Sequence, residues 1–187
     1  RPKRGDLRMT ADADFWKRQY QGMWDSSSDR EKNISALIAF HTGAHLSSVG
    51  LGAGSSAFLS GSAASHGLQK GDADLRVDGT DIYIEVTGPL TKSVDETSAL
   101  WFRPDKIQNA IVHFGDHDTW LLHHLPKSDL IRVIHVDQAF MESYQNHPFP
   151  IVPPTTRGQK ETYAEIPSDS EFIQPPMALY RTIIKRL

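Results

Sequence analysis

Residues 71–89 read GDADLRVDGTDIYIEVTGP. Two runs rich in β-branched residues flank the turn sequence DGTD at 78–81, a pattern typical of a β-hairpin. Acidic residues stand inside both runs, and Glu85 lies within IYIEVTG, which otherwise suits a buried strand. Because charged side chains are rarely buried without a partner or a function, the hairpin is the first candidate for a functional site.

The hairpin places an aspartate opposite Glu85 in either of two registers. A two-residue loop at 79–80 sets Asp74 opposite Glu85, whereas a loop at 78–79 sets Asp72 there. Either aspartate then lies within roughly 5 Å of the glutamate, and like charges facing each other destabilise a sheet. A divalent cation would offset this repulsion, since Mg²⁺ is held by one or two carboxylates, waters and substrate phosphate. The alternative interpretation is a solvated acidic strand face.

The remaining sequence predicts an α/β fold with a mixed central sheet flanked by helices. We expect residues 1–28 to form a basic arm with a short helix, and 29–187 to form one domain. The expected helices are 29–49, 103–114, 138–145 and 176–187, and the expected strands are the hairpin 73–87, then 118–125 and 129–136, with an edge strand at 161–167. Loops are expected at 51–67, around a short strand at 57–60, and at 91–100 and 146–160.

The composition excludes several classes of protein. The 187 residues include no cysteine, which excludes disulfides, cysteine-ligated zinc and a cysteine nucleophile. This fits an intracellular location, in the cytoplasm or in the nucleus or nucleoid. The apolar runs are shorter than the ~20 residues that span a bilayer, so we expect no membrane partner. The nine histidines form no H-E-x-x-H pattern. The formal net charge of −3 gives no strong overall field, although basic residues cluster in the first 18 positions.

The hairpin resembles the motif of the PD-(D/E)XK nuclease superfamily, which includes many restriction enzymes and junction resolvases. The resemblance rests on Ala73-Asp74, ten intervening residues, and then Glu85-Val86-Thr87, together with the order of elements over about 29–137. It implies a restriction-endonuclease-like αβββαβ core and an endonuclease that uses Mg²⁺ or Mn²⁺. The implied partner is nucleic acid, for which we expect DNA rather than RNA. A homodimer, or a place within a longer polypeptide, stays open.

The resemblance assigns roles to individual residues. It implies that Asp74 and Glu85 are metal ligands, joined by the backbone carbonyl of Val86 and by Glu31, near the start of the first long helix. The family has lysine where this chain has Thr87, and a threonine hydroxyl can bind a water but carries no positive charge.

Three outcomes follow from the missing lysine. Another cation replaces it, with Lys106 as the first candidate and Lys92 and Arg103 as others; or the metal suffices; or only binding remains. Trp101, beside Arg103, is the aromatic side chain that we expect to contact nucleic acid. The competing functions are therefore a metal-dependent nuclease, an inactive module that binds nucleic acid or a protein, and a hydrolase of small nucleotides.

Overall fold

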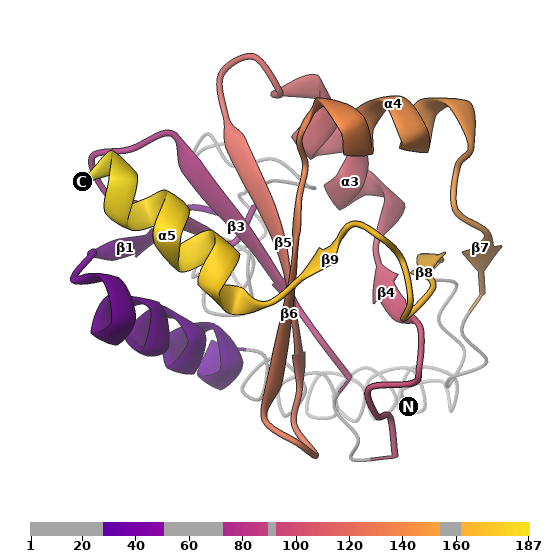
Figure 1. The fold of residues 1–187 in the computed structure, drawn as a ribbon, viewed down its shortest axis with the longest axis horizontal. Helices are drawn as coiled ribbons and strands as arrows, with labels where there is room; N and C mark the ends of the chain where they lie inside the picture. The colour runs from indigo at the N-terminus through magenta and orange to yellow at the C-terminus, as the bar shows by residue number, and fades with distance from the viewer. Residues whose placement is uncertain (1–27, 51–72, 90–92, 154–161) are drawn as a thin grey trace, which may run out of the picture.

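The computed structural model describes residues 28–50, 73–89, 93–153 and 162–187 (Figure 1). The predicted basic arm and the strand at 57–60 lie outside these ranges. The first described helix covers 28–42 and is drawn in indigo in Figure 1. The other helices are α3 (Pro104–Val112), α4 (Gln138–Asn146) and α5 (Pro176–Arg186). In the described part of the chain, no helix is both long enough and apolar enough to cross a membrane.

The predicted α/β class is confirmed. The main sheet has six strands in the order β1-β2-β3-β5-β6-β9, and a second sheet has the order β4-β8-β7. The strands of the main sheet are β1 (Leu46–Ser48), β2 (Leu75–Val77), β3 (Ile82–Thr87), β5 (Asp118–Leu125), β6 (Leu130–His135) and β9 (Ile173–Gln174). Those of the small sheet are β4 (Leu100–Phe102), β7 (Ile151–Val152) and β8 (Tyr163–Ile166). Because β3 and β5 run parallel and the other neighbours antiparallel, the main sheet is mixed, as expected.

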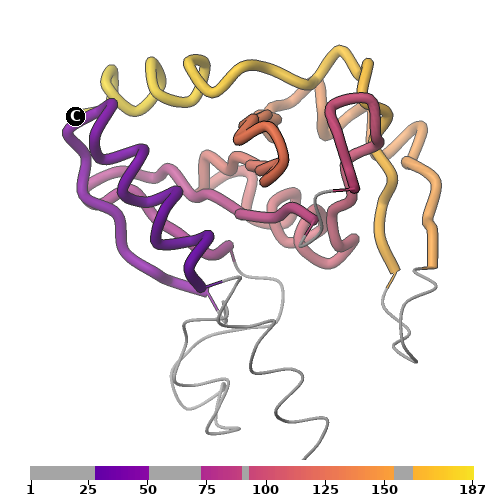
Figure 2. Tube along the Cα trace, turned by 90° about the horizontal axis from the view of Figure 1, so that it is seen from below, coloured from indigo at the N-terminus to yellow at the C-terminus, as the bar shows by residue number. Residues whose placement is uncertain are grey.

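The main sheet is covered on both faces (Figure 1). Helix 28–42 and α5 pack on one face, where Ile38, Ile84 and Ile183 belong to one buried cluster. The helices α3 and α4 and the small sheet cover the other face, where Ile107 and Phe140 join a second cluster. Figure 2 shows helix 28–42 and α5 with one end of each close together at one side of the molecule, from where the two helices diverge. Burial on both faces fits the consecutive apolar residues at the centre of β5, Trp120, Leu121 and Leu122, which a strand with one solvated face would not carry.

The hairpin adopts the first of the two predicted registers. Leu75 pairs with Ile84 and Arg76 with Tyr83, so Asp74 stands opposite Glu85. Asp78 and Asp81 lie in the turn, where Asp78 accepts a hydrogen bond from the Ser47 hydroxyl at 2.7 Å. The turn is thereby tied to the neighbouring strand β1, which fixes how the hairpin sits in the sheet.

The predicted helix 29–49 is too long. The helix ends at residue 42, and 46–48 form β1 instead. The Thr42 hydroxyl donates a hydrogen bond to the Ile38 carbonyl oxygen within the helix. Gly43 follows with φ +75°, and its N–H donates to Ala39 O at 2.8 Å. A left-handed residue after the last turn is a common helix end, and glycine adopts it at no steric cost. The prediction extended to residue 49 because it relied on the spacing of apolar residues and gave no weight to this helix end.

The small sheet corrects three other predictions. Leu100, which the predicted loop at 91–100 includes, and Trp101, which follows that loop, belong to β4. The expected edge strand at 161–167 contains β8, but β8 is the middle strand, because β4 pairs with it on one side and β7 on the other. The predicted loop at 146–160 contains β7, and β9 was not predicted at all. Strands of two or three residues carry too little periodicity to be detected from sequence.

Candidate functional site

The candidate site consists of two carboxylates and one ammonium group under the first turn of α3. Asp74 and Glu85 face each other across β2 and β3, and are only 6% and 7% exposed. Lys106 places its Nζ 2.8 Å from Glu85 Oε2 and 3.4 Å from Asp74 Oδ1. Asp74 Oδ2 also accepts a 2.8 Å hydrogen bond from the Val86 N–H, which fixes this carboxylate against β3. The three charged groups therefore form one compact cluster.

The charges of this cluster are strongly coupled. Burial raises the pKa of Glu85 well above its usual value, and the negative charge of Asp74 raises it further, while Lys106 opposes both effects. Burial acts to lower the pKa of Lys106, but the carboxylates of Glu85 and Asp74 outweigh burial and raise it. Lys106 is therefore an ammonium ion at neutral pH, and acts as a donor and a positive charge rather than as a base.

The donor set fits a hard divalent cation. Two carboxylates on one sheet face supply the oxygen ligands that Mg²⁺ and Mn²⁺ use, with waters and substrate phosphate completing the shell. Glu85 Oε2 is buried and has no well-directed hydrogen bond among the described residues, and the Lys106 ammonium lies 2.8 Å from it. One ammonium group cannot neutralise two carboxylates. The described residues nevertheless contain no group of three or more acidic or histidine side chains placed to hold a metal.

A second row of polar side chains continues from Thr87 across the sheet. Thr87 lies in register with His123 of β5, and His123 lies in register with Arg132 of β6. Arg132 Nη2 lies 3.3 Å from His123 Nδ1, and since arginine only donates, Nδ1 accepts and the proton of His123 sits on Nε2. Burial, together with the charges of Arg132, Arg30 and His124, lowers the pKa of His123 to about 3. His123 is therefore a neutral imidazole.

The end of β3 is held from the opposite face by Arg30 of helix 28–42. Its guanidinium donates to Gly88 O at 2.7 Å and also to Pro89 O. Gly88 itself lies so close to β5 that an added Cβ would be 2.1 Å from His124 O. Burial lowers the pKa of Arg30 and that of Arg132. Two guanidinium groups thus surround the end of β3, where they bind carbonyl oxygens and the His123 ring.

The structure also describes two of the other residues proposed from sequence, Glu31 and Arg103. Glu31 is half-buried in the first turn of helix 28–42, and is not gathered with Asp74 and Glu85 into a metal-holding group within the described chain. Arg103 immediately precedes α3 and pairs with Asp105. Lys92 lies outside the described residues. The structure therefore brings together Asp74, Glu85 and Lys106, with Val86 supplying an N–H contact.

Trp101 lies on the small sheet. It is 42% exposed, its Nε1 donates to Glu165 at 2.9 Å, and its ring stacks on Tyr163. Trp101 is therefore an ordered aromatic surface on the strand that leads into α3, and not part of a loop.

Sequence reasoning missed a column of planar groups beside the carboxylates. The rings of Tyr83 and His117 are stacked 3.8 Å apart, and those of His117 and His113 are 4.7 Å apart. The guanidinium of Arg76 lies over the other face of Tyr83, 5.6 Å from the ring centroid. Strand alternation already placed Tyr83 on the face of Glu85, but nothing in the sequence showed that His113, which caps α3, and His117, which precedes β5, would reach it.

Comparison with known proteins gives one structural likeness. No family model matches the sequence, and a search of curated proteins finds no match. Among solved structures, a nuclease from a fusselovirus is similar with a TM-score of 0.39 and 15% identity, over 60% of this chain and 65% of that one. This chain therefore spans just under two thirds of the length of that protein. The assignment of a function consequently rests on the geometry of the site.

Proposed function

We propose that this protein is a metal-dependent nuclease that hydrolyses phosphodiester bonds in nucleic acid. The observation that carries the proposal is the buried cluster of Asp74, Glu85 and Lys106, in which two carboxylates face each other and a cation lies against both. Asp74 and Glu85 would hold Mg²⁺ or Mn²⁺. When bound, the ion would neutralise phosphate charge and lower the pKa of a bound water.

The protein side chains supply the remaining requirements of hydrolysis. Lys106 stays protonated, so its ammonium group can donate to a non-bridging phosphate oxygen and stabilise the charge that develops there. The Thr87 hydroxyl lies on the same face of β3 as Glu85 and can hydrogen-bond the attacking water. The attacking water gives one proton to solvent as its oxygen bonds to phosphorus, the bond to the leaving oxygen breaks, and that oxygen takes a proton from solvent. We propose DNA as the substrate in preference to RNA, and an intracellular location.

The proposal is tested with single-stranded and duplex DNA and RNA in Mg²⁺, Mn²⁺ or a chelator. We expect cleavage that needs the metal, and a loss of at least about 100-fold in Glu85→Gln and Asp74→Asn, which keep the shape of each side chain but remove its charge. Asp78→Asn is the matched control, because Asp78 belongs to the same hairpin but is exposed in the turn. Equal activity in Glu85→Gln and in the wild type would show that the cluster is not the active site.

Metal binding can be followed without any substrate. Mn²⁺ should raise the Tm of the wild type and of Asp78→Asn, because it binds the folded state, but should leave Glu85→Gln unchanged.

The second candidate is a catalytically inactive module that binds nucleic acid or a protein. The observation that favours it is the position of Lys106, whose Nζ lies within 3.4 Å of both carboxylates and thereby offsets their repulsion without a metal. In that case the cluster is a buried ion-pair network. No Tm change with Mn²⁺, and no cleavage of any nucleic acid tested, would support this function over the nuclease.

A further inference from the structure

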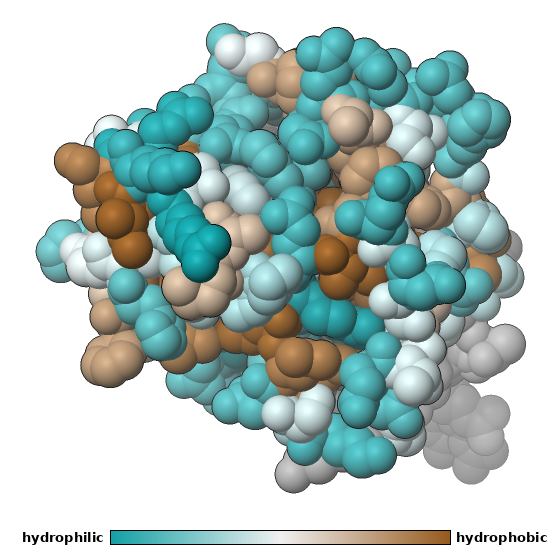
Figure 3. Space-filling model, in the orientation of Figure 1, coloured by the Kyte–Doolittle hydropathy of each residue, from teal (hydrophilic) through white to brown (hydrophobic). Residues whose placement is uncertain are grey.

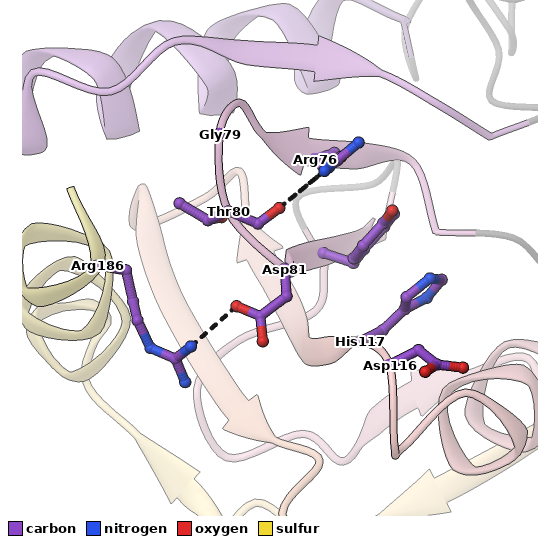
Figure 4. A pocket seen from close by; sticks show the side chains of 8 residues that line it. Arg76, Gly79, Thr80, Asp81, Asp116, His117 and Arg186 are labelled. Atoms are coloured by element: carbon purple, nitrogen blue, oxygen red, sulfur yellow. Dashed lines mark hydrogen bonds and ion pairs between the residues drawn. The ribbon is translucent and has the colours of Figure 1, made fainter.

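An open pocket lies at the end of the sheet where the hairpin turns (Figure 4). Its volume is about 450 Å³, which falls within the range of small-molecule sites. Figure 4 shows Arg76 and His117 on one side and Arg186 on the other, with Asp81 between them. The main lining side chains are Arg76, Asp81, Tyr83, Asp116, His117 and Arg186. The pocket therefore combines planar cationic, aromatic and acidic groups from four separate parts of the chain.

Three planar groups that line this pocket, Arg76, Tyr83 and His117, form an ordered column that His113 continues beyond the lining. Arg76, Tyr83, His117 and His113 follow one another as a column, with an angle of 17° between the Tyr83 and His117 planes and 18° between the two histidines. Arg76 Nε and Nη2 both donate to Thr80 O, at 3.1 and 3.0 Å, so the guanidinium is held over Tyr83. Arg76 is exposed, and a planar ligand can extend the column at this end.

The column lies next to the proposed catalytic cluster. Tyr83 precedes Glu85 by two residues on β3, and Arg76 follows Asp74 by two residues in β2, so both pairs share one face of the hairpin. Two residues of extended strand span about 7 Å, which is about two nucleotide rises along a duplex. The helix α3 also connects the cluster to the column. Lys106 of the cluster lies in its first turn, and His113 of the column is its C-cap residue. A bound strand whose phosphate reached Lys106 would therefore bring a neighbouring nucleotide to the column.

The charge of the pocket indicates what part of a nucleotide it accepts. Arg186 is already paired with Asp81 at 3.0 Å and approaches Asp118 at 3.7 Å, and Asp116 adds another carboxylate at the rim. A pocket with balanced charge attracts phosphate weakly. It suits a neutral planar ligand with both donors and acceptors on its edge, which describes a nucleobase. Exposed bases stack on aromatic rings and on guanidinium planes in complexes with unpaired nucleic acid.

We propose that this pocket binds an unpaired nucleobase one or two nucleotides from the scissile phosphate, so that the substrate is single-stranded or locally unpaired nucleic acid. The inference rests on the proposed nuclease function for the position of the phosphate. The base recognition itself can be tested without cleavage. A duplex would keep the base in its stack and out of reach of the column.

The first experiment measures binding by fluorescence anisotropy in chelator, using Glu85→Gln as the background so that no cleavage occurs. The probes are a labelled single strand of mixed sequence and the duplex of the same sequence. We expect the single strand to bind more tightly, and His117→Ala and Arg76→Ala to weaken its binding by about fivefold or more, in line with the loss of one stacked base. Tyr83→Phe keeps the ring and should bind normally, whereas Tyr83→Ala should not.

Arg181→Ala is the matched control, since Arg181 is an exposed arginine on α5 that does not line the pocket. Equal binding by His117→Ala, Arg76→Ala and Arg181→Ala would overturn the proposal, as would equal affinity for single strand and duplex. A Tm measurement for each variant separates lost binding from lost fold.

The second experiment replaces one nucleotide at a time by an abasic residue and follows cleavage in Mn²⁺. The proposal expects the rate to fall at one position, one or two nucleotides from the cut, and expects His117→Ala to be insensitive to that replacement. Cleavage that is indifferent to every abasic position would refute base recognition while leaving the nuclease function intact. Pocket-dependent binding without any cleavage would refute the nuclease function instead.

Discussion

Lys106 places a positive charge against two carboxylates of the hairpin, although it lies on a different element. Thr87 occupies the position where a lysine would be expected, yet an ammonium group still lies against Asp74 and Glu85, because the first turn of α3 passes over the hairpin. A lysine on the helix and a lysine on β3 can approach the same two carboxylates from different elements. What matters for the chemistry is the position of the charge, and not the strand or helix that carries it.

This interpretation predicts a rescue. Lys106→Ala should reduce cleavage by about 100-fold or more, because one charged donor to the phosphate is removed. Adding Thr87→Lys to Lys106→Ala should restore part of that activity, since residue 87 is on the face of Glu85 two positions further along β3. Lys185→Ala on α5 is the control. A double variant that is no more active than Lys106→Ala would show that a charge near the carboxylates is insufficient.

His123 predicts how stability depends on pH. Its pKa is about 3 in the folded protein, against 6.5 for an unperturbed histidine, so between these values only the unfolded chain binds the proton. Stability from this residue is therefore complete above pH 6.5 and is lost as the pH falls toward 3. His123→Gln cannot titrate, so the wild type should lose about 2 kcal/mol more than this variant between pH 7 and pH 5. Urea unfolding at both pH values measures this, and an equal loss would contradict the buried neutral imidazole.

At the scale of elements, the end of β3 is the point that positions the site. The strand runs parallel to β5 as far as Thr87, and Gly88 then passes against the backbone of His124 while Arg30 binds the Gly88 carbonyl. Helix 28–42 and β5 thus hold the same short segment from two sides. This explains how a strand that carries a buried carboxylate keeps its register despite the repulsion.

Gly88→Ala tests the importance of this contact. The added Cβ would lie 2.1 Å from a backbone oxygen, which cannot turn aside as a side chain can. We expect a loss of about 3 kcal/mol or more in the free energy of unfolding, at the upper end of overpacking effects. Gly115→Ala should cost less than about 0.5 kcal/mol, because nothing lies within 4 Å of its Cβ position. Chemical denaturation compares the two variants, and similar values for both would refute the close approach.

At the scale of the whole molecule, one sheet separates two cores. Trp120 and Leu122 of β5 point into the cluster under helix 28–42 and α5, and Leu121 between them points into the cluster under α3 and α4. The cluster of Asp74, Glu85 and Lys106 lies on the second side, where Lys106 of α3 reaches the hairpin. Exposed apolar side chains do not form one continuous patch on the face shown in Figure 3, where polar residues separate them.

Shared strands make the two cores unfold together. Ile183→Ala in one core should cost about 2–5 kcal/mol and Phe140→Ala in the other about 3–5 kcal/mol, because both side chains are fully buried. Each variant should still show a single transition, since losing either core exposes the same central strands. Circular dichroism and tryptophan fluorescence should report the same midpoint. Two separated transitions in either variant would show that the cores are independent.

Local patterns in the sequence determined the hairpin, three of the four described helices and the strands β5 and β6, because these elements are long enough to show apolar periodicity. The facing pair of Asp74 and Glu85 also followed from strand geometry, with two registers left open. The short strands β4, β7 and β9 could not be predicted from local sequence, because they are stabilised by pairing with strands far along the chain.

The tertiary structure alone decided which distant groups meet the hairpin. It set Asp74 rather than Asp72 opposite Glu85, and it brought Lys106 of α3, together with His113 and His117 that follow this helix, to the hairpin. It also buried His123 against Arg132, which sets the protonation state of that ring. The physical reason is the same in each case. Periodicity reports the face on which a residue lies, whereas burial and charge coupling depend on contacts between elements that are separated in sequence.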